Sequence, residues 1–213
     1  MYRIYISIKL ILTGFCILAS NYIMAISNNI HLKNKIIPEA LINEVGTALS
    51  YYPELAETRI EFKLKPSLKK SFMKAQPKFS SLIKSKGKRE YVILISKVFK
   101  IDGMQLPLAD IPKNVLIGWL GHELGHIMDY KNRNTINLIW FGIRYFFSQN
   151  HIREAERIAD VYAITHQMQQ YIVETKRFIL NNGNFPMVYK DRIRKLYLSP
   201  DEILSLAREL EGN

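Results

Sequence analysis

The sequence predicts an α+β domain in which two strands precede a mainly helical region. Residues 58–65 alternate apolar and charged side chains, as a half-buried strand does, and residues 91–96 form a continuous apolar run typical of a buried strand. From residue 112 onward the apolar spacing changes to the period of helices. A chain of 213 residues that is 48% hydrophobic can bury one core, so we expect a single globular domain over residues 27–213.

Residues 1–26 have the layout of a secretory signal peptide. They begin with two basic residues and no acidic one, continue with an apolar run over residues 10–19, and end near the small residue Ala25. The same stretch could be kept as an N-terminal anchor, or it could form an apolar first helix of the fold. We expect a signal peptide or an anchor, and therefore an exported protein.

Positive charge is concentrated in residues 59–100. This segment has thirteen Lys and Arg residues against Glu61 and Glu90, whereas the rest of the chain is balanced, so the segment accounts for the formal charge of +11. Scattered lysines often only keep a surface solvated. A basic surface also attracts anionic lipid, acidic polypeptide or nucleic acid. Because an exported protein seldom meets chromosomal DNA, nucleic acid is not the expected partner, and an anionic membrane surface is a candidate partner of this segment beside the simpler explanation of a solvated surface.

Helical spacing recurs over much of the remaining chain. It covers residues 38–52, 112–130 and 151–180, and residues 199–202 have the capping-box pattern that starts a last helix. Residues 135–147 are apolar almost all round but too short to cross a membrane. For them we expect a buried helix or hairpin rather than an interfacial membrane segment. Residues 102–112 are rich in turn-forming residues.

The sequence GHELGH at residues 121–126 places His122 and His126 four residues apart. At about 100° per residue, both project from one side of the predicted helix, opposite the arc of its apolar residues, so we expect them to face away from the core. Two imidazoles at this spacing can bind one tetrahedral ion. Glu123 points to the side where it can take a proton from a metal-bound water. The alternative is a surface pair of histidines beside a helical glutamate.

A catalytic zinc ion needs a third protein ligand and an open fourth position. Cys16, the single cysteine, lies in the predicted export segment, which excludes a thiol ligand. The remaining candidates are a carboxylate or one of His31, His151 and His166. We favour Glu156, because Asp160 lies four residues further along the same helical face and can accept the outer N–H of a liganding histidine. Otherwise these two acids would be a surface pair matched to Arg153 or Arg157.

Small residues follow both of the helical faces that carry these groups. Beside the histidines lie Gly118, Gly121 and Gly125, and beside the two acids lie Ala155, Ala159 and Ala163. Small residues allow two helices to approach closely. We therefore expect the two helices to pack against each other, so that a carboxylate on one shares an ion with the histidines on the other.

With HELGH at residues 122–126 followed by ERIAD at residues 156–160, the chain resembles the gluzincin zinc metallopeptidases, specifically the family of the CAAX-processing and heat-shock membrane peptidases. The resemblance covers about residues 112–163. It implies a zincin-like fold, with a small sheet packed on an HExxH helix and a second helix that bears the glutamate. It also implies one Zn²⁺ per chain, bound by His122, His126 and Glu156, with Glu123 as general base and acid and Asp160 orienting a liganding histidine. The chain departs from the membrane-embedded members in the short interval between the two motifs.

The expected function is that of an exported zinc metalloendopeptidase acting on a peptide or protein substrate, which could lie along a sheet edge as an added strand. A side chain that stabilises the oxyanion is also expected. The candidates are Tyr189, Arg192, Tyr197 and His166. Two other functions remain open. One is a catalytically silent, zinc-stabilised binding module, and the other is a DNA-associated metalloprotease of the SprT type, against which the export segment argues.

Overall fold

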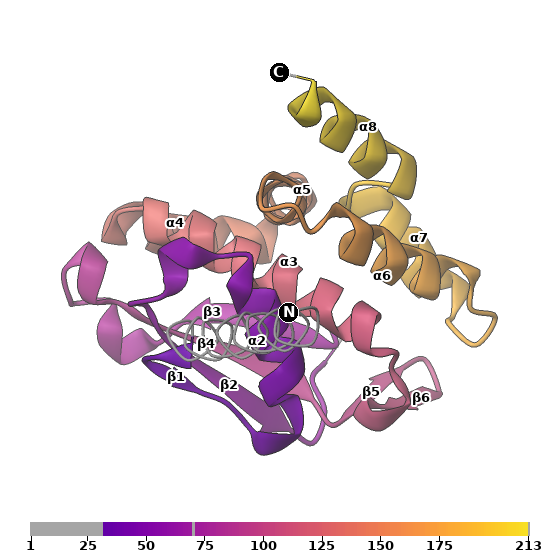
Figure 1. The fold of residues 1–213 in the computed structure, drawn as a ribbon, viewed down its shortest axis with the longest axis horizontal. Helices are drawn as coiled ribbons and strands as arrows, with labels where there is room; N and C mark the ends of the chain where they lie inside the picture. Colours follow the sequence, from indigo (N-terminus) through magenta and orange to yellow (C-terminus); the bar gives the residue numbers. More distant parts are fainter. Residues whose placement is uncertain (1–31, 70, 213) are drawn as a thin grey trace, which may run out of the picture.

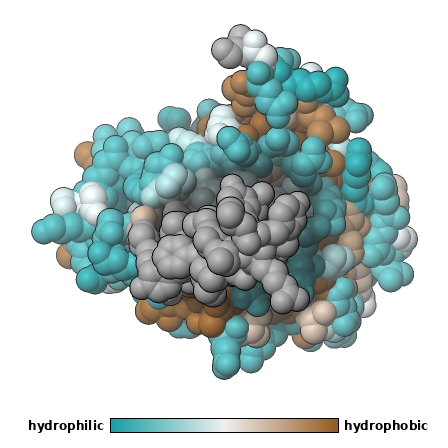
Figure 2. Space-filling model, viewed as in Figure 1, coloured by the Kyte–Doolittle hydropathy of each residue, from teal (hydrophilic) through white to brown (hydrophobic). Residues whose placement is uncertain are grey.

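The computed structural model describes residues 32–69 and 71–212 (Figure 1). The predicted signal peptide or anchor, residues 1–26, and the candidate ligand His31 lie outside the described residues. The fold is α+β, as predicted: a small mixed sheet and a β-hairpin occupy the first half of the described chain, and helices occupy the second half. Among the described residues on the face seen in Figure 2, hydrophilic ones predominate.

The main sheet has four strands in the order β1-β2-β4-β3. Parallel pairing joins β1 (Lys35–Ile36), β2 (Arg59–Lys65) and β4 (Glu90–Ser96), and β3 (Met73–Pro77) is an antiparallel edge strand beside β4. The strands β2 and β4 are the two that the sequence predicts. The strand β3 was not expected, because it lies in the lysine-rich segment and its five residues contain only two apolar side chains besides proline.

The central helix is α3 (Lys113–Asn132), which carries the two histidines. It contacts β3 on one side and α2 (Ile42–Ser50), α5 (Gln149–Thr165) and α6 (Gln169–Asn181) on others, and Figure 1 shows it between the sheet and α5. Because α3 is covered all round, every residue from 115 to 127 is buried. The prediction that the histidines face away from the core is therefore wrong, since α5 covers their side of α3.

The predicted helix over residues 151–180 is two helices, because the chain turns between α5 and α6. Gln167 adopts a left-handed conformation with φ of 61°, and the N–H of Met168 donates to the carbonyl of Ala163 at 2.9 Å. No glycine or proline marks this turn, so its position was not visible in the sequence. The turn sends α6 back along α3, and both α5 and α6 therefore reach the histidine-bearing helix.

The apolar segment 135–147 is the helix α4 (Thr135–Phe147). The prediction of a helix is confirmed, but the prediction of burial is wrong for one of its faces. Leu138 is buried, whereas Ile136 and Phe147 are strongly exposed. Among the residues that the structure describes, no helix is both long enough and apolar enough to span a bilayer.

The other elements frame this core. A hairpin of β5 (Val98–Ile101) and β6 (Met104–Pro107) turns at Asp102 and Gly103, both with positive φ, in the segment predicted to be turn-rich. Short 3-10 helices cover Glu39–Leu41, Pro53–Leu55, Phe79–Ser81, Lys86–Lys88 and Leu108–Asp110. Helix α7 (Met187–Leu196) was not expected. Helix α8 (Pro200–Glu211) begins with the predicted capping box, formed by Ser199 and Glu202.

Candidate metal centre

Three of the predicted ligand residues converge between α3 and α5. The Nε2 atoms of His122 and His126 lie 3.0 Å and 3.3 Å from Oε2 of Glu156. All three side chains are buried, and one ligand atom from each lies within 4.8 Å of the others. The structure therefore brings together a buried group that could hold a metal ion.

The alternatives to Glu156 lie elsewhere in the described structure. His151 Nδ1 is 3.7 Å from the Glu154 carboxylate, and the ring of His166 is stacked on that of Tyr52, with the centroids 4.3 Å apart. Arg157 pairs with Glu202 at 2.9 Å rather than with the acids of its own helix. The interpretation of Glu156 and Asp160 as a surface acidic pair is therefore wrong, because both are buried against α3.

The close approach of α3 and α5 depends on Gly125. A Cβ atom at this position would lie 2.5 Å from the carbonyl oxygen of Ala159, which is backbone and cannot rotate away. Gly121 and Gly118 face the α5–α6 turn and α6 instead. The predicted contact of two small-residue strips is thus found at Gly125 and Ala159. The other two glycines allow the α5–α6 turn and α6 to approach α3 instead.

Gly125→Ala is expected to push α5 away from α3. We expect the free energy of unfolding to fall by about 1–3 kcal/mol, and metal affinity to fall because Glu156 moves from the histidines. Denaturant unfolding and a zinc titration measure the two effects. Gly142→Ala on α4 is the matched control, because an added Cβ there meets nothing within 4 Å. Equal stability of the two variants would contradict the role assigned to Gly125.

Glu123 follows His122 on α3, and one oxygen of its carboxylate bonds to the sheet. Its Oε2 accepts a hydrogen bond from the N–H of Ala75 on β3, with the nitrogen and oxygen 2.6 Å apart. The side chain is buried, and this burial raises the pKa of the Glu123 carboxyl. A carboxylate beside the candidate metal position, not itself bonded to the histidines, is available as a base.

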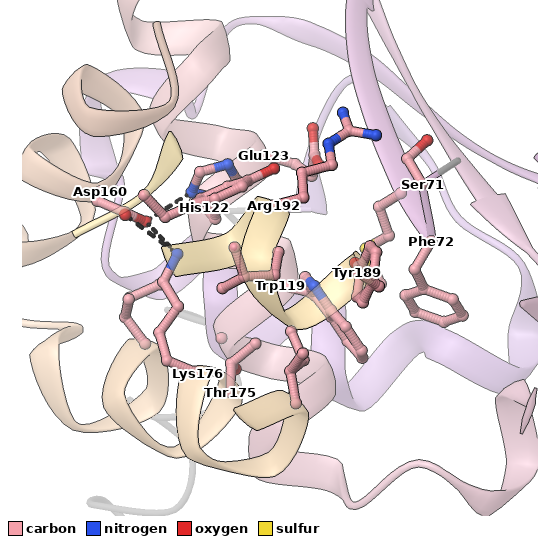
Figure 3. Close-up of a pocket in the computed structure, with 16 residues that line it drawn as sticks. Ser71, Phe72, Trp119, His122, Glu123, Asp160, Thr175, Lys176, Tyr189 and Arg192 are labelled. Carbon is pink, nitrogen blue, oxygen red and sulfur yellow. Dashed lines mark hydrogen bonds and ion pairs between the residues drawn. The ribbon is translucent and has the colours of Figure 1, made fainter. Parts of the chain in front are cut away.

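Asp160 contacts the outer ring nitrogen of His122. Its Oδ1 lies 2.8 Å from His122 Nδ1, its Oδ2 accepts from the N–H of Leu198 at 3.1 Å, and both oxygens lie close to Lys176 Nζ (Figure 3). Burial alone would raise the pKa of Asp160, but Lys176 and His122 hold it below its usual range. If Nδ1 of His122 donates to Asp160, its Nε2 would be available to bind a metal.

The charge of this cluster suits a divalent cation. In their ionised forms Glu123, Glu156 and Asp160 carry three negative charges, against the ammonium of Lys176. Burial lowers the pKa of His122, but hydrogen bonds to Asp160 and Glu156 outweigh it and raise the pKa to about 10. A divalent ion bound between these side chains would balance the two negative charges that Lys176 leaves uncompensated. The donor set therefore fits a metal.

Tyr145 on α4 is a contact that the sequence analysis missed. Its hydroxyl donates to Glu156 Oε1 at 2.6 Å, while Oε2 faces the histidines. Burial, followed by the charge of Glu156, raises the pKa of Tyr145, so the phenol remains a donor. The spacing of Leu138, Phe141 and Tyr145 marks the inward face of α4 and could have indicated this residue.

A cavity adjoins His122 and Glu123 (Figure 3). The cavity volume open to water is about 40 Å³. One water molecule needs about 10–15 Å³ of such volume, so the cavity has room for water. Of the four candidates for oxyanion stabilisation, Tyr189, Arg192 and Tyr197 line this cavity, whereas His166 does not. Burial raises the pKa of both tyrosines, which therefore keep their protons.

Comparison with protein-family models, with curated proteins and with solved structures finds no match for this chain. The structure itself shows an α+β domain with a buried group of two histidines and one glutamate that could hold a metal ion.

Proposed function

We propose that this protein is an exported zinc metalloendopeptidase of the gluzincin type, with a zincin-like fold. The observation that carries the proposal is the convergence of His122, His126 and Glu156 on one point, with Glu123 beside it. Two imidazoles and one carboxylate are a donor set of catalytic zinc sites, in which a fourth position stays open. When bound, zinc supplies Lewis acidity, which polarises a scissile carbonyl and lowers the pKa of water.

The proton transfers are assigned to Glu123. As general base it removes a proton from the attacking water, and as general acid it returns that proton to the leaving amine. Burial raises the pKa of its carboxyl, and a raised pKa makes a carboxylate a better acceptor of the proton from water. The N–H of Ala75 holds the carboxylate in place during both transfers.

The edge strand β3 is the proposed binding surface for the peptide. The backbone groups of Phe72 and Lys78 bond to β4, so by the alternation of antiparallel strands those of Met73 and Ala75 point outward. The Ala75 N–H reaches Glu123, which means that the outer edge of β3 borders the catalytic carboxylate. A substrate added as a strand along this edge would bring its backbone to the site.

The first test is metal content together with proteolysis. We expect elemental analysis of the purified chain to find one zinc per chain, and the chain to cleave an unstructured protein such as casein until a chelator removes the metal. Glu156→Ala is expected to lower zinc affinity about 10-fold or more and to abolish cleavage, since it removes one ligand of three. A chain that takes up no zinc even after reconstitution would contradict the proposal.

Two other outcomes would assign the site differently. Stoichiometric zinc with no cleavage of any polypeptide would favour a zinc-stabilised binding module. Unprocessed protein found in the cytosol, with DNA affinity that falls steeply with salt, would favour a DNA-associated metalloprotease of the SprT type. The mass of the protein recovered outside the cytosol would show whether residues 1–26 are removed or kept as an anchor.

A further inference from the structure

The outer face of α4 presents a continuous apolar stripe. Its members are Ile136, Ile139, Trp140, Ile143 and Phe147, here called the α4 stripe, and their exposed fractions run from 44% to 87%. At about 100° per residue these five positions fall within one third of the helix circumference. Contiguous apolar patches of this kind mark interaction surfaces, whereas single exposed apolar residues do not.

A second exposed apolar segment adjoins the start of α4. The loop over residues 78–89 exposes Phe79 by 88% and Ile83 by 94%. Hydrogen bonds fix this loop to α4: Arg89 Nη2 donates to Thr135 Oγ1 at 2.9 Å, and that hydroxyl donates to the Leu82 carbonyl at 3.3 Å. The loop and the α4 stripe are therefore neighbouring parts of one end of the molecule (Figure 1).

The charge around these apolar residues is mostly positive. No acidic residue occurs in the sequence between Asp129 and Glu154 or between Glu61 and Glu90, while the loop over residues 78–89 contains four lysines. Two of them, Lys78 and Lys84, pair with Glu61 and Glu90, and Lys86 and Lys88 are exposed. Arg133, which pairs with Asp129, and Arg144 line a groove of about 340 Å³ beside Trp140, and Glu154 is the acidic residue in its lining. Apolar side chains flanked by basic ones match an anionic lipid surface, whose acyl region takes the former and whose headgroups take the latter.

We propose that the α4 stripe and the loop over residues 78–89 dock on the surface of an anionic lipid bilayer. A second copy of the chain is a poorer occupant, because contact between two such faces would bring their basic residues together. The opposite side of α4 bears Tyr145, which bonds Glu156. Docking would therefore place the candidate metal centre about one helix diameter, roughly 10 Å, behind the lipid surface. The inference stands independently of whether the centre binds zinc or cleaves peptides.

Tryptophan quenching tests the proposal in the full chain. Residues 1–26 could hold the chain on a vesicle by themselves, so binding alone is not the readout. The chain has two tryptophans, Trp119 in the core and Trp140 in the α4 stripe. On vesicles of phosphatidylglycerol with brominated acyl chains, we expect Trp140 emission to shift to shorter wavelength and to be quenched. Trp140→Phe should lose this quenching, because Trp119 is distant from solvent and lipid.

Two further variants separate the α4 stripe from other apolar residues. Ile139→Asp combined with Ile143→Asp should lower the quenching of Trp140 at a fixed lipid concentration about 10-fold or more. The two added carboxylates would oppose insertion of the α4 stripe into the lipid. Val188→Asp is the matched control, since Val188 is exposed and apolar but lies on α7. Unquenched Trp140 on vesicles that carry the bound chain would overturn the proposal. So would a concentration-dependent dimer that shields Trp140 from lipid.

Discussion

Glu123→Gln is expected to keep one zinc per chain and to lose cleavage of casein by about 10²–10⁴-fold, the usual contribution of a general acid–base group. Glutamine has the same shape and can still accept the hydrogen bond that Ala75 donates to Oε2. It cannot accept a proton from water at neutral pH. Since Glu123 is not among the three converging groups, the ligands remain intact. Elemental analysis and the rate of casein cleavage, measured on one preparation, check both halves of this expectation.

The control for this substitution is Glu154→Gln. Glu154 lies on α5, close in sequence to the third ligand, but its side chain is largely exposed. We expect its loss of charge to leave both zinc content and cleavage unchanged. If Glu123→Gln cleaved casein as fast as Glu154→Gln does, the general base would have to be another group, and the assignment of Glu123 would be wrong.

The residues of the candidate metal centre could be predicted because their relative positions depend on local geometry. His122 and His126 are related by one helical turn, and so are Glu156 and Asp160, so each pair has a fixed relative position before any packing is known. That the two pairs face each other is a tertiary fact, for which the small residues on both helices gave a partial indication. Gly125 against Ala159 confirms it, and the other glycines show how incomplete the indication was.

The parts of the site that could not be predicted come from elements whose placement is set by distant contacts. The strand β3 has too few apolar residues to show an alternating pattern, yet Ala75 bonds Glu123 because β3 pairs with β4. Lys176 lies on a helix that reaches the site only because the chain turns at Gln167. The segment containing Tyr145 is apolar on nearly every face, so its sequence did not distinguish the face that meets Glu156 from the exposed one.

Lys176→Met is expected to lower the free energy of unfolding by about 3–5 kcal/mol, the cost of removing one partner of a buried ion pair. Lys176 Nζ lies 3.0 Å from Asp160 Oδ2, and both side chains are almost fully buried. Methionine fills a similar volume but leaves the aspartate charge without its ammonium. Denaturant unfolding measures the loss, with Lys195→Met as the control, because that lysine is exposed and bonds only to Gln149 among the contacts described.

Adding Asp160→Asn to Lys176→Met separates the two roles of Asp160. Replacing both partners of a buried ion pair is often nearly neutral, so we expect the double variant to recover most of the lost stability. The zinc affinity of the double variant should stay below that of the unaltered chain. A neutral amide is a weaker acceptor than a carboxylate for the His122 N–H, which makes the imidazole a poorer ligand. A double variant that regained both stability and full zinc affinity would show that Asp160 serves only to pair with Lys176. Recovered stability with about 10-fold weaker zinc binding would assign Asp160 to the orientation of His122.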